Sequence, residues 1–203
     1  MILDGALTAI GISVPDSSLS RAAHELIATV APPYLVNHSV RAYAWAVELA
    51  RHDGLRFDPE ILYVSAIFHD IGLVPAYDLG GCFERDGAIE AERFSLEHLQ
   101  PPGKGRAIFD VIDLHQLDET PPGSTNEVVL LNHSTGTDVT GYRYDHVRPD
   151  AMGAVLAAYP RLDFKRDFAA AFSDQAARKP SCIAAEMVRT GLLEEIANAP
   201  FDS

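Results

Sequence analysis

The chain has 203 residues, 47% of them hydrophobic and 22% charged, an ordinary balance for one globular domain with a substantial core. Its formal net charge of −13 argues against nucleic acid as a partner, because that binding depends on lysine and arginine contacts to phosphates. The same charge gives no support for an anionic membrane surface as a partner, and no apolar run approaches the roughly 20 residues that cross a bilayer. Because the N-terminus also lacks the basic start of a signal peptide, the sequence predicts a cytoplasmic protein.

Apolar residues at helical spacing, together with capping residues and proline or glycine breaks, predict an all-α fold without any convincing alternating strand. The segment 1–16 is predicted to be a loose lead into the first helix. The predicted helices span about 18–30, 35–52, 59–70, 86–99, 104–115, from 127 towards 136–141, 150–159, 163–178 and 181–190.

The central helix of this series is the one predicted over 59–70. It begins at a capping Asp58-Pro59 pair, is apolar on almost every side, and ends with His69 and Asp70. An ionised carboxylate in such an apolar segment must be paired or must coordinate a metal. Imidazole and carboxylate together suit Zn, Fe, Mn, Co or Ni, so this pair is a candidate metal-binding element.

Three further polar residues stand out along the chain. His38 lies early in the second predicted helix, and Arg41 shares its face, where it could hold an anionic substrate or form an internal salt bridge. Asp138 lies among threonines and glycines that are poor helix formers. We therefore expect the sixth helix to be distorted around Asp138, and such local conflicts concentrate at functional sites.

The two cysteines, Cys82 and Cys182, fit no metal-binding spacing. In a reducing cytosol they are expected to be free thiols. A disulfide between them is the alternative that the sequence leaves open.

His38, the pair His69-Asp70, and Asp138 follow one another in an order that resembles the HD-domain superfamily of metal-dependent enzymes. Flanking segments resemble its cyanamide-hydratase-like branch, and these are Asn37-His38-Ser39, Phe68-His69-Asp70-Ile71-Gly72, Phe83-Glu84-Arg85-Asp86-Gly87 and Thr135-Gly136-Thr137-Asp138-Val139-Thr140-Gly141. The resemblance covers about residues 20–160. It implies one HD-domain helical bundle over 1–203, with helices at about 150–195 packed on the core.

The resemblance implies one divalent metal ion held by His38, His69, Asp70 and Asp138. Zinc is the first expectation, with Fe, Mn, Co or Ni as alternatives, because such a ligand set accepts several metals. Metal-bound hydroxide would attack the carbon of a small nitrile-type substrate, as in the conversion of cyanamide to urea, and Asp70 or a nearby histidine would move the proton. A homodimer would fit the family.

Other residues receive roles by the same resemblance. His115 is expected to transfer a proton or to support the metal ligands, with a surface histidine as the alternative. Glu84 is a candidate general acid or base near the mouth of the pocket, or an acid that favours a helix start. Arg41 and Phe83 are candidates for substrate binding.

Two rival functions share this fold. The first is a metal-dependent phosphohydrolase acting on nucleotides or phosphomonoesters, although Arg41, Arg85, Lys104 and Arg106 form no recognisable phosphate cradle. The absence of an adjacent histidine pair between the His69-Asp70 pair and Asp138 favours one metal over two. The second rival is a non-catalytic HD module that binds a small ligand, which a lost metal ligand would indicate, and none is lost.

Overall fold

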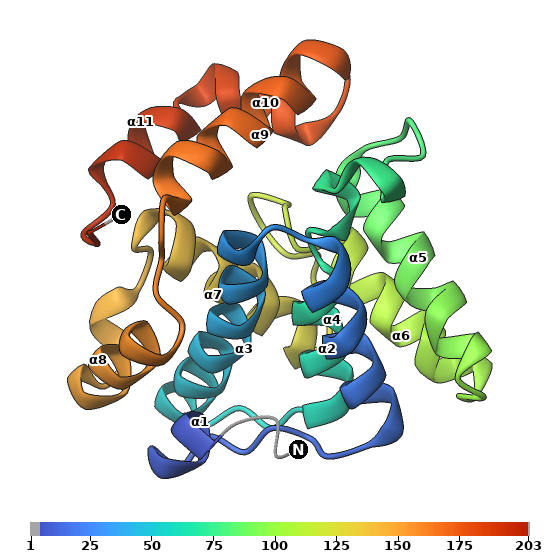
Figure 1. Cartoon of the computed structure of the whole chain (residues 1–203), viewed down its shortest axis with the longest axis vertical. Helices are drawn as coiled ribbons and strands as arrows, with labels where there is room; N and C mark the ends of the chain where they lie inside the picture. The colour runs from blue at the N-terminus through green and yellow to red at the C-terminus, as the bar shows by residue number, and fades with distance from the viewer. Residues whose placement is uncertain (1–4, 203) are drawn as a thin grey trace.

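The computed structural model describes residues 5–202, which form helices and contain no strand, so the predicted all-α class is confirmed. Within this range no helix combines the length and the apolar character needed to span a membrane. The α-helices are α1 (Gly5–Ala9), α2 (Ser18–Val30), α3 (Pro33–Asp53), α4 (Pro59–Phe68), α5 (Phe83–Glu97), α6 (Pro102–Asp113), α7 (Asn126–Thr140), α8 (Pro149–Ala158), α9 (Phe164–Arg178), α10 (Ile183–Thr190) and α11 (Leu192–Asn198) (Figure 1). Short 3₁₀ turns are η1 (Ile71–Leu73), η2 (Pro75–Tyr77) and η3 (Tyr144–His146).

Capping residues set the boundaries of the central helices. The Ser17 hydroxyl accepts from the Ser20 amide at the start of α2, and the Asp58 carboxylate accepts from the first amides of α4. Helix α3 ends at Gly54, whose φ of 68° lies in the left-handed region that glycine adopts without strain. These helices therefore begin and end close to where the sequence predicts.

Helix α4 lies at the centre of the larger hydrophobic core, and all of its residues from Leu62 to Phe68 are buried. It contacts α2, α3, α6 and α7, while α5 and α6 pack against each other as a pair beside it. Because α4 is buried on every side from Leu62 onwards, its C-terminal end lies in the interior of the protein. His69 and Asp70 are therefore placed at the heart of the fold.

The last three helices form a layer at one end of this bundle. Figure 1 shows α9, α10 and α11 together in orange and red, above the N-terminal end of α3. A second hydrophobic core joins this layer to the bundle, with Phe164, Phe168 and Phe172 of α9 packed near Phe83 and Val139. The two cores meet around the first turns of α3, which is where His38 lies.

The structure differs from the predicted elements in three places. Helix α7 continues unbroken to Thr140, because its packing against α3 outweighs the poor helix propensity of Thr137 and Thr140. Helix α5 starts at Phe83 instead of 86. Helices α1 and α11 were not predicted, since elements of five and seven residues carry too little periodicity to detect.

Candidate metal centre

Two histidines and an aspartate converge between α3 and the end of α4. His38 lies in the second turn of α3, His69 caps the C-terminus of α4, and Asp70 follows it. The Nε2 atoms of His38 and His69 are 3.1 Å apart. Oδ2 of Asp70 lies 3.3 Å from the first of these nitrogens and 3.1 Å from the second. All three side chains are buried, so the structure brings together three of the four predicted ligands.

The chain can turn away after Asp70 only because residue 72 is glycine. A Cβ atom at Gly72 would lie 2.1 Å from the backbone oxygen of Phe83, which no real contact permits. The start of α5 therefore passes directly against η1. This close approach brings Phe83 to the same region as the convergent ligands.

Hydrogen bonds fix the orientation of both imidazoles. Nδ1 of His69 donates to the backbone oxygen of Ala66 at 2.7 Å. Nδ1 of His38 lies 2.7 Å from Oδ2 of Asp138 and donates to it. With the proton on Nδ1, the neutral form of each imidazole carries its lone pair on Nε2, which faces Asp70, as in metal-ligating histidines whose ring is held by an outer acceptor.

The Asp70 carboxylate supplies the test of whether this group fits a metal. Neither of its oxygens has a hydrogen-bond donor among the described residues, although the side chain is buried. A buried carboxylate is costly unless its charge is offset, and two neutral imidazoles do not offset it. A divalent cation between the three donors would accept from all of them. The residues present therefore fit a bound divalent metal.

His115 follows α6 and approaches the same carboxylate from another side. Its Nε2 lies 3.9 Å from Oδ1 of Asp70, and its Nδ1 donates to the backbone oxygen of Ile112 at 2.6 Å. The Gln116 amide lies 2.9 Å from the Nε2 atom and donates to it. Burial, reinforced by nearby His69, lowers the pKa of His115 to about 3, so the ring is neutral near pH 7.

Asp138 differs from its predicted placement. Its Oδ1 accepts from Arg41 Nε and Trp45 Nε1, each at 2.8 Å, and its Oδ2 accepts from Arg41 Nη2 at 2.7 Å. The carboxylate thus contacts the outer nitrogen of His38 and does not converge with Asp70. Arg41 and Trp45 share the His38 face of α3, and together they draw the carboxylate to that side. Although burial opposes the charged form, the Arg41 guanidinium holds the pKa of Asp138 well below its usual range.

Arg41 forms an internal salt bridge, which is the alternative that the sequence left open. Its side chain is fully buried, and its Nη1 donates to the backbone oxygens of Tyr159 and Pro160 at 3.1 and 3.3 Å. With its other two nitrogens on Asp138, all three nitrogens donate to protein acceptors. The structure therefore places Arg41 behind the centre, and not where a substrate could reach it.

Two residues near Asp138 were missed by sequence reasoning. Trp45 could have been found, because it lies one turn beyond Arg41 on the same face of α3. Arg161 gave no signal in the sequence. Its Nη1 donates to the backbone oxygen of Asp138 at 2.8 Å, and its guanidinium stacks over the ring of Phe164. Both residues help to fix the position of Asp138.

Aromatic rings from α9 and α5 close the remaining sides of the centre. The rings of Phe164 and Phe168 lie 4.9 and 5.3 Å from the His38 ring. Phe83 lies 6.1 Å from the His115 ring and 5.3 Å from Phe172. These rings give the centre an apolar wall, and the substrate-binding role of Phe83 stays a prediction.

Glu84 lies outside the convergent group. Burial raises the pKa of its carboxyl, and the charges that act on it are those of Asp113, Lys179 and Asp86. Within residues 5–202 no hydrogen bond or ion pair joins Glu84 to His38, His69 or Asp70. Its predicted acid–base role is therefore not supported by its contacts.

A cavity of about 340 Å³ opens beside the centre, between α7 and the C-terminal layer. His115, Thr135 and Phe168 belong to its lining, and His115 and Phe168 also contact the convergent group. No lysine or arginine is among its lining residues in the described part of the chain. The cavity thus adjoins the centre through His115 and Phe168, although none of the three convergent side chains is in its lining, and it offers no cation to a phosphate.

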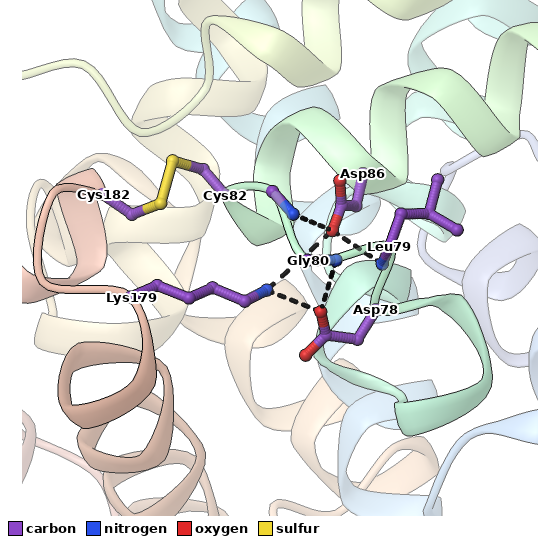
Figure 2. Close-up of a disulfide and its surroundings, with 8 residues drawn as sticks. Asp78, Leu79, Gly80, Cys82, Asp86, Lys179 and Cys182 are labelled. Atoms are coloured by element: carbon purple, nitrogen blue, oxygen red, sulfur yellow. Dashed lines mark hydrogen bonds and ion pairs between the residues drawn. A yellow bond between two sulfur atoms is a disulfide. The ribbon is translucent and has the colours of Figure 1, made fainter.

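A disulfide joins Cys82 to Cys182, which corrects the expectation of free thiols. The expectation failed because 100 residues separate the two cysteines, and only the folded chain brings their Cα atoms to 5.3 Å. Figure 2 shows Lys179 beside the bond, with its Nζ 2.8 Å from Asp78 and 3.8 Å from Asp86. The disulfide and the two ion pairs of Lys179 connect the C-terminal layer to the segment that precedes α5.

Comparison with known proteins agrees with this arrangement. Residues 35–141, just over half of the 203-residue chain, match the HD domain family. The chain belongs to the HD-domain family. It is also 25% identical over 178 residues to two proteins of Saccharomyces cerevisiae, cyanamide hydratase DDI2 and cyanamide hydratase DDI3, covering 82% of this chain and 76% of each relative. The HD domain implies a divalent metal, and His38, His69 and Asp70 form the group that fits it.

Proposed function

We propose that this HD-domain protein is a metal-dependent hydratase of small nitriles, with cyanamide as substrate and urea as product. The observation that carries the proposal is the buried His38–His69–Asp70 group, whose carboxylate lacks any hydrogen-bond donor among the described residues. The similarity to cyanamide hydratases supports the choice of reaction. Zinc is the first metal to test, and Fe, Mn, Co and Ni suit the same donors.

A bound divalent ion would lower the pKa of a water molecule and polarise the nitrile. His38 and His69 hold their Nε2 atoms towards that position, and the acceptors Asp138 and the Ala66 carbonyl keep both rings from rotating. Asp70 contributes the negative charge that favours a cation. The chain thus provides a rigid set of three donors.

His115 is the residue that we propose moves the proton. It is neutral near pH 7, and its Nε2 lies 3.9 Å from the Asp70 carboxylate. In hydration a C–O bond forms at the nitrile carbon, and the protons of the water pass to the former nitrile nitrogen. Nε2 is the only nitrogen of this ring that can accept, so the Gln116 amide must first give up its hydrogen bond. Because the ring is a weak base, it would hold the first of these protons only briefly before it returns the proton to that nitrogen.

The phosphohydrolase alternative has weaker support. Arg41 is buried on Asp138, and Arg85 lies 2.8 Å from Asp113 in an ion pair. The cavity lining contains neither lysine nor arginine in the described chain, although phosphate recognition relies on such groups. We therefore expect no turnover across a panel of nucleotides and phosphomonoesters.

The decisive experiment measures urea formation from cyanamide by protein of known metal content. We expect turnover that depends on metal, and loss of both metal and activity in Asp70→Ala. If Asp70→Ala kept full metal content and full activity, the proposed mechanism would be wrong. Fully metallated protein that formed no urea yet hydrolysed a nucleotide would favour the phosphohydrolase instead.

A further inference from the structure

The cavity beside the centre is larger than the proposed reaction of cyanamide requires. Cyanamide is a nitrile carbon flanked by two nitrogens, and a molecule of that size needs roughly two to three times the ~30 Å³ that one water occupies. The cavity measures about 340 Å³, within the range that holds organic ligands. Bound cyanamide would therefore leave most of the cavity volume unfilled.

One side of the cavity is apolar. Phe168 and Phe172 of α9 contribute aromatic faces, while Val139 of α7, Met187 of α10 and Leu192 of α11 contribute aliphatic surface. Phe168 also lies 5.3 Å from the His38 ring, so this wall leads directly away from the centre. It offers favourable burial to an apolar group attached to the nitrile carbon.

Another part of the lining is polar and carries two solvent-exposed carboxylates. Asp118 and Glu195 belong to the lining, and within residues 5–202 neither carboxylate forms an ion pair. His133 is the other histidine of the lining besides His115. Burial and the neighbouring Arg143 lower the pKa of His133, so it adds no positive charge near pH 7. This wall therefore attracts a cation and repels an anion.

We propose that the cavity binds the substituent of an organic nitrile larger than cyanamide, one whose apolar part ends in a positively charged amine. This inference rests on the proposed hydratase function. The nitrile carbon would lie at the centre, the apolar part against Phe168 and Phe172, and the amine near Asp118 and Glu195. Hydration adds one water across the C≡N bond to give the primary amide, so no oxidant or reductant is needed.

Three benzonitriles that differ only in the para substituent test the charge preference. They are 4-(aminomethyl)benzonitrile, which is a cation, 4-methylbenzonitrile, which is neutral, and 4-cyanobenzoate, which is an anion. With metallated protein we expect amide formation in the order cation, neutral, anion. The kcat/KM of the cation should exceed that of the anion by at least about fivefold, as expected for one ion pair at 4 Å in water.

A charge reversal at the cavity provides the matched variant. Glu195→Lys places a cation in the lining beside the remaining Asp118, so the two charges offset each other and the preference for the cationic substrate should be lost. Glu25→Lys makes the same change in net charge at an exposed position of α2, outside the cavity, and should keep the original order of the substrates. An equal effect of both variants would show that net charge alone sets the preference, which would overturn the inference.

Cyanamide in the same assay separates this inference from the proposed function. If cyanamide is hydrated but none of the aromatic nitriles is hydrated or bound in calorimetry, the cavity does not serve larger substrates, while the hydratase function stands. If fully metallated protein hydrates no nitrile at all, the proposed function itself fails, and this inference fails with it.

Discussion

His38 is held between two carboxylates that have different tasks. Asp138 accepts a hydrogen bond from Nδ1, and Asp70 faces Nε2 from the opposite side of the ring. Asp138 is in turn fixed by the two nitrogens that Arg41 donates and by the indole of Trp45. A change at Asp138 should therefore reach the metal through His38, without any direct contact.

Asp138→Asn tests this indirect role. The variant keeps the shape of the side chain but leaves the buried Arg41 without its counter-charge, so we expect a loss of about 3–5 kcal/mol in the free energy of unfolding. Metal affinity should fall about 10- to 100-fold while one ion still binds at saturation. Metal titration and urea denaturation measure the two effects.

The exposed Asp174→Asn, which removes only a surface pair with Arg178, is the control and should change neither quantity. If Asp138→Asn binds no metal even at saturation, Asp138 is itself a ligand, as the sequence predicted.

His115→Ala separates proton transfer from metal binding. Because Nε2 of His115 lies 3.9 Å from Asp70 and outside the three converging donors, the variant should retain one metal ion. Urea formation should fall by about 10²- to 10⁴-fold, the usual contribution of a positioned acid or base. Loss of the metal together with activity would instead make His115 a ligand. His98→Ala, which changes a histidine stacked on Phe94 at the end of α5, should leave both readouts unchanged.

The sequence predicted which residues meet at the centre better than it predicted how each one points. His38, His69 and Asp70 meet because α3 and α4 pack against each other, and apolar periodicity already indicates both helices. The direction of the Asp138 carboxylate depends on Arg41 and Trp45, that is, on a choice between hydrogen-bond partners in three dimensions. The spacing of residues along the chain does not predict which of these partners Asp138 binds.

At the scale of elements, α9 is the helix that completes the site. Its phenylalanines cover His38 and line the cavity, although α9 begins more than 90 residues after α4 ends. The sequence predicted α9 as an amphipathic helix, but the surface it covers depends on long-range packing. The same limit hid the Cys82–Cys182 bond, which connects the start of α5 to the start of α10.

Removal of that bond should loosen the C-terminal layer. The disulfide spans a sequence separation of 100 residues, and a closed loop of that length stabilises the folded state by about 4–5 kcal/mol in the chain-entropy description. We expect the double variant Cys82→Ser/Cys182→Ser to unfold at lower urea concentration. Dithiothreitol should shift the parent protein to the same midpoint and leave the double variant unchanged. Equal midpoints for the oxidised parent and the double variant would contradict a stabilising role.

At the scale of the whole molecule, the centre lies where the two hydrophobic cores meet. His69 follows the central helix of the larger core, while the His38 ring packs on Phe164 and Phe168 of the smaller one. One ion would thus connect donors that sit on two helices and between two cores. Its binding energy should appear as stability of the entire fold, because the unfolded chain does not bring these donors together.

Chelation of the metal should therefore lower the melting temperature of the protein. At a free metal concentration 100 times the dissociation constant, binding contributes about 2.7 kcal/mol to the free energy of unfolding. For a chain of this size, that corresponds to a fall of roughly 5–10 °C. Differential scanning calorimetry before and after EDTA treatment measures it, and added zinc should restore the original value. Asp70→Ala, which lacks the carboxylate, should show no shift with EDTA or zinc. A shift of equal size in that variant would place the stabilising ion elsewhere, for instance at the exposed His52–Asp53–His146 group.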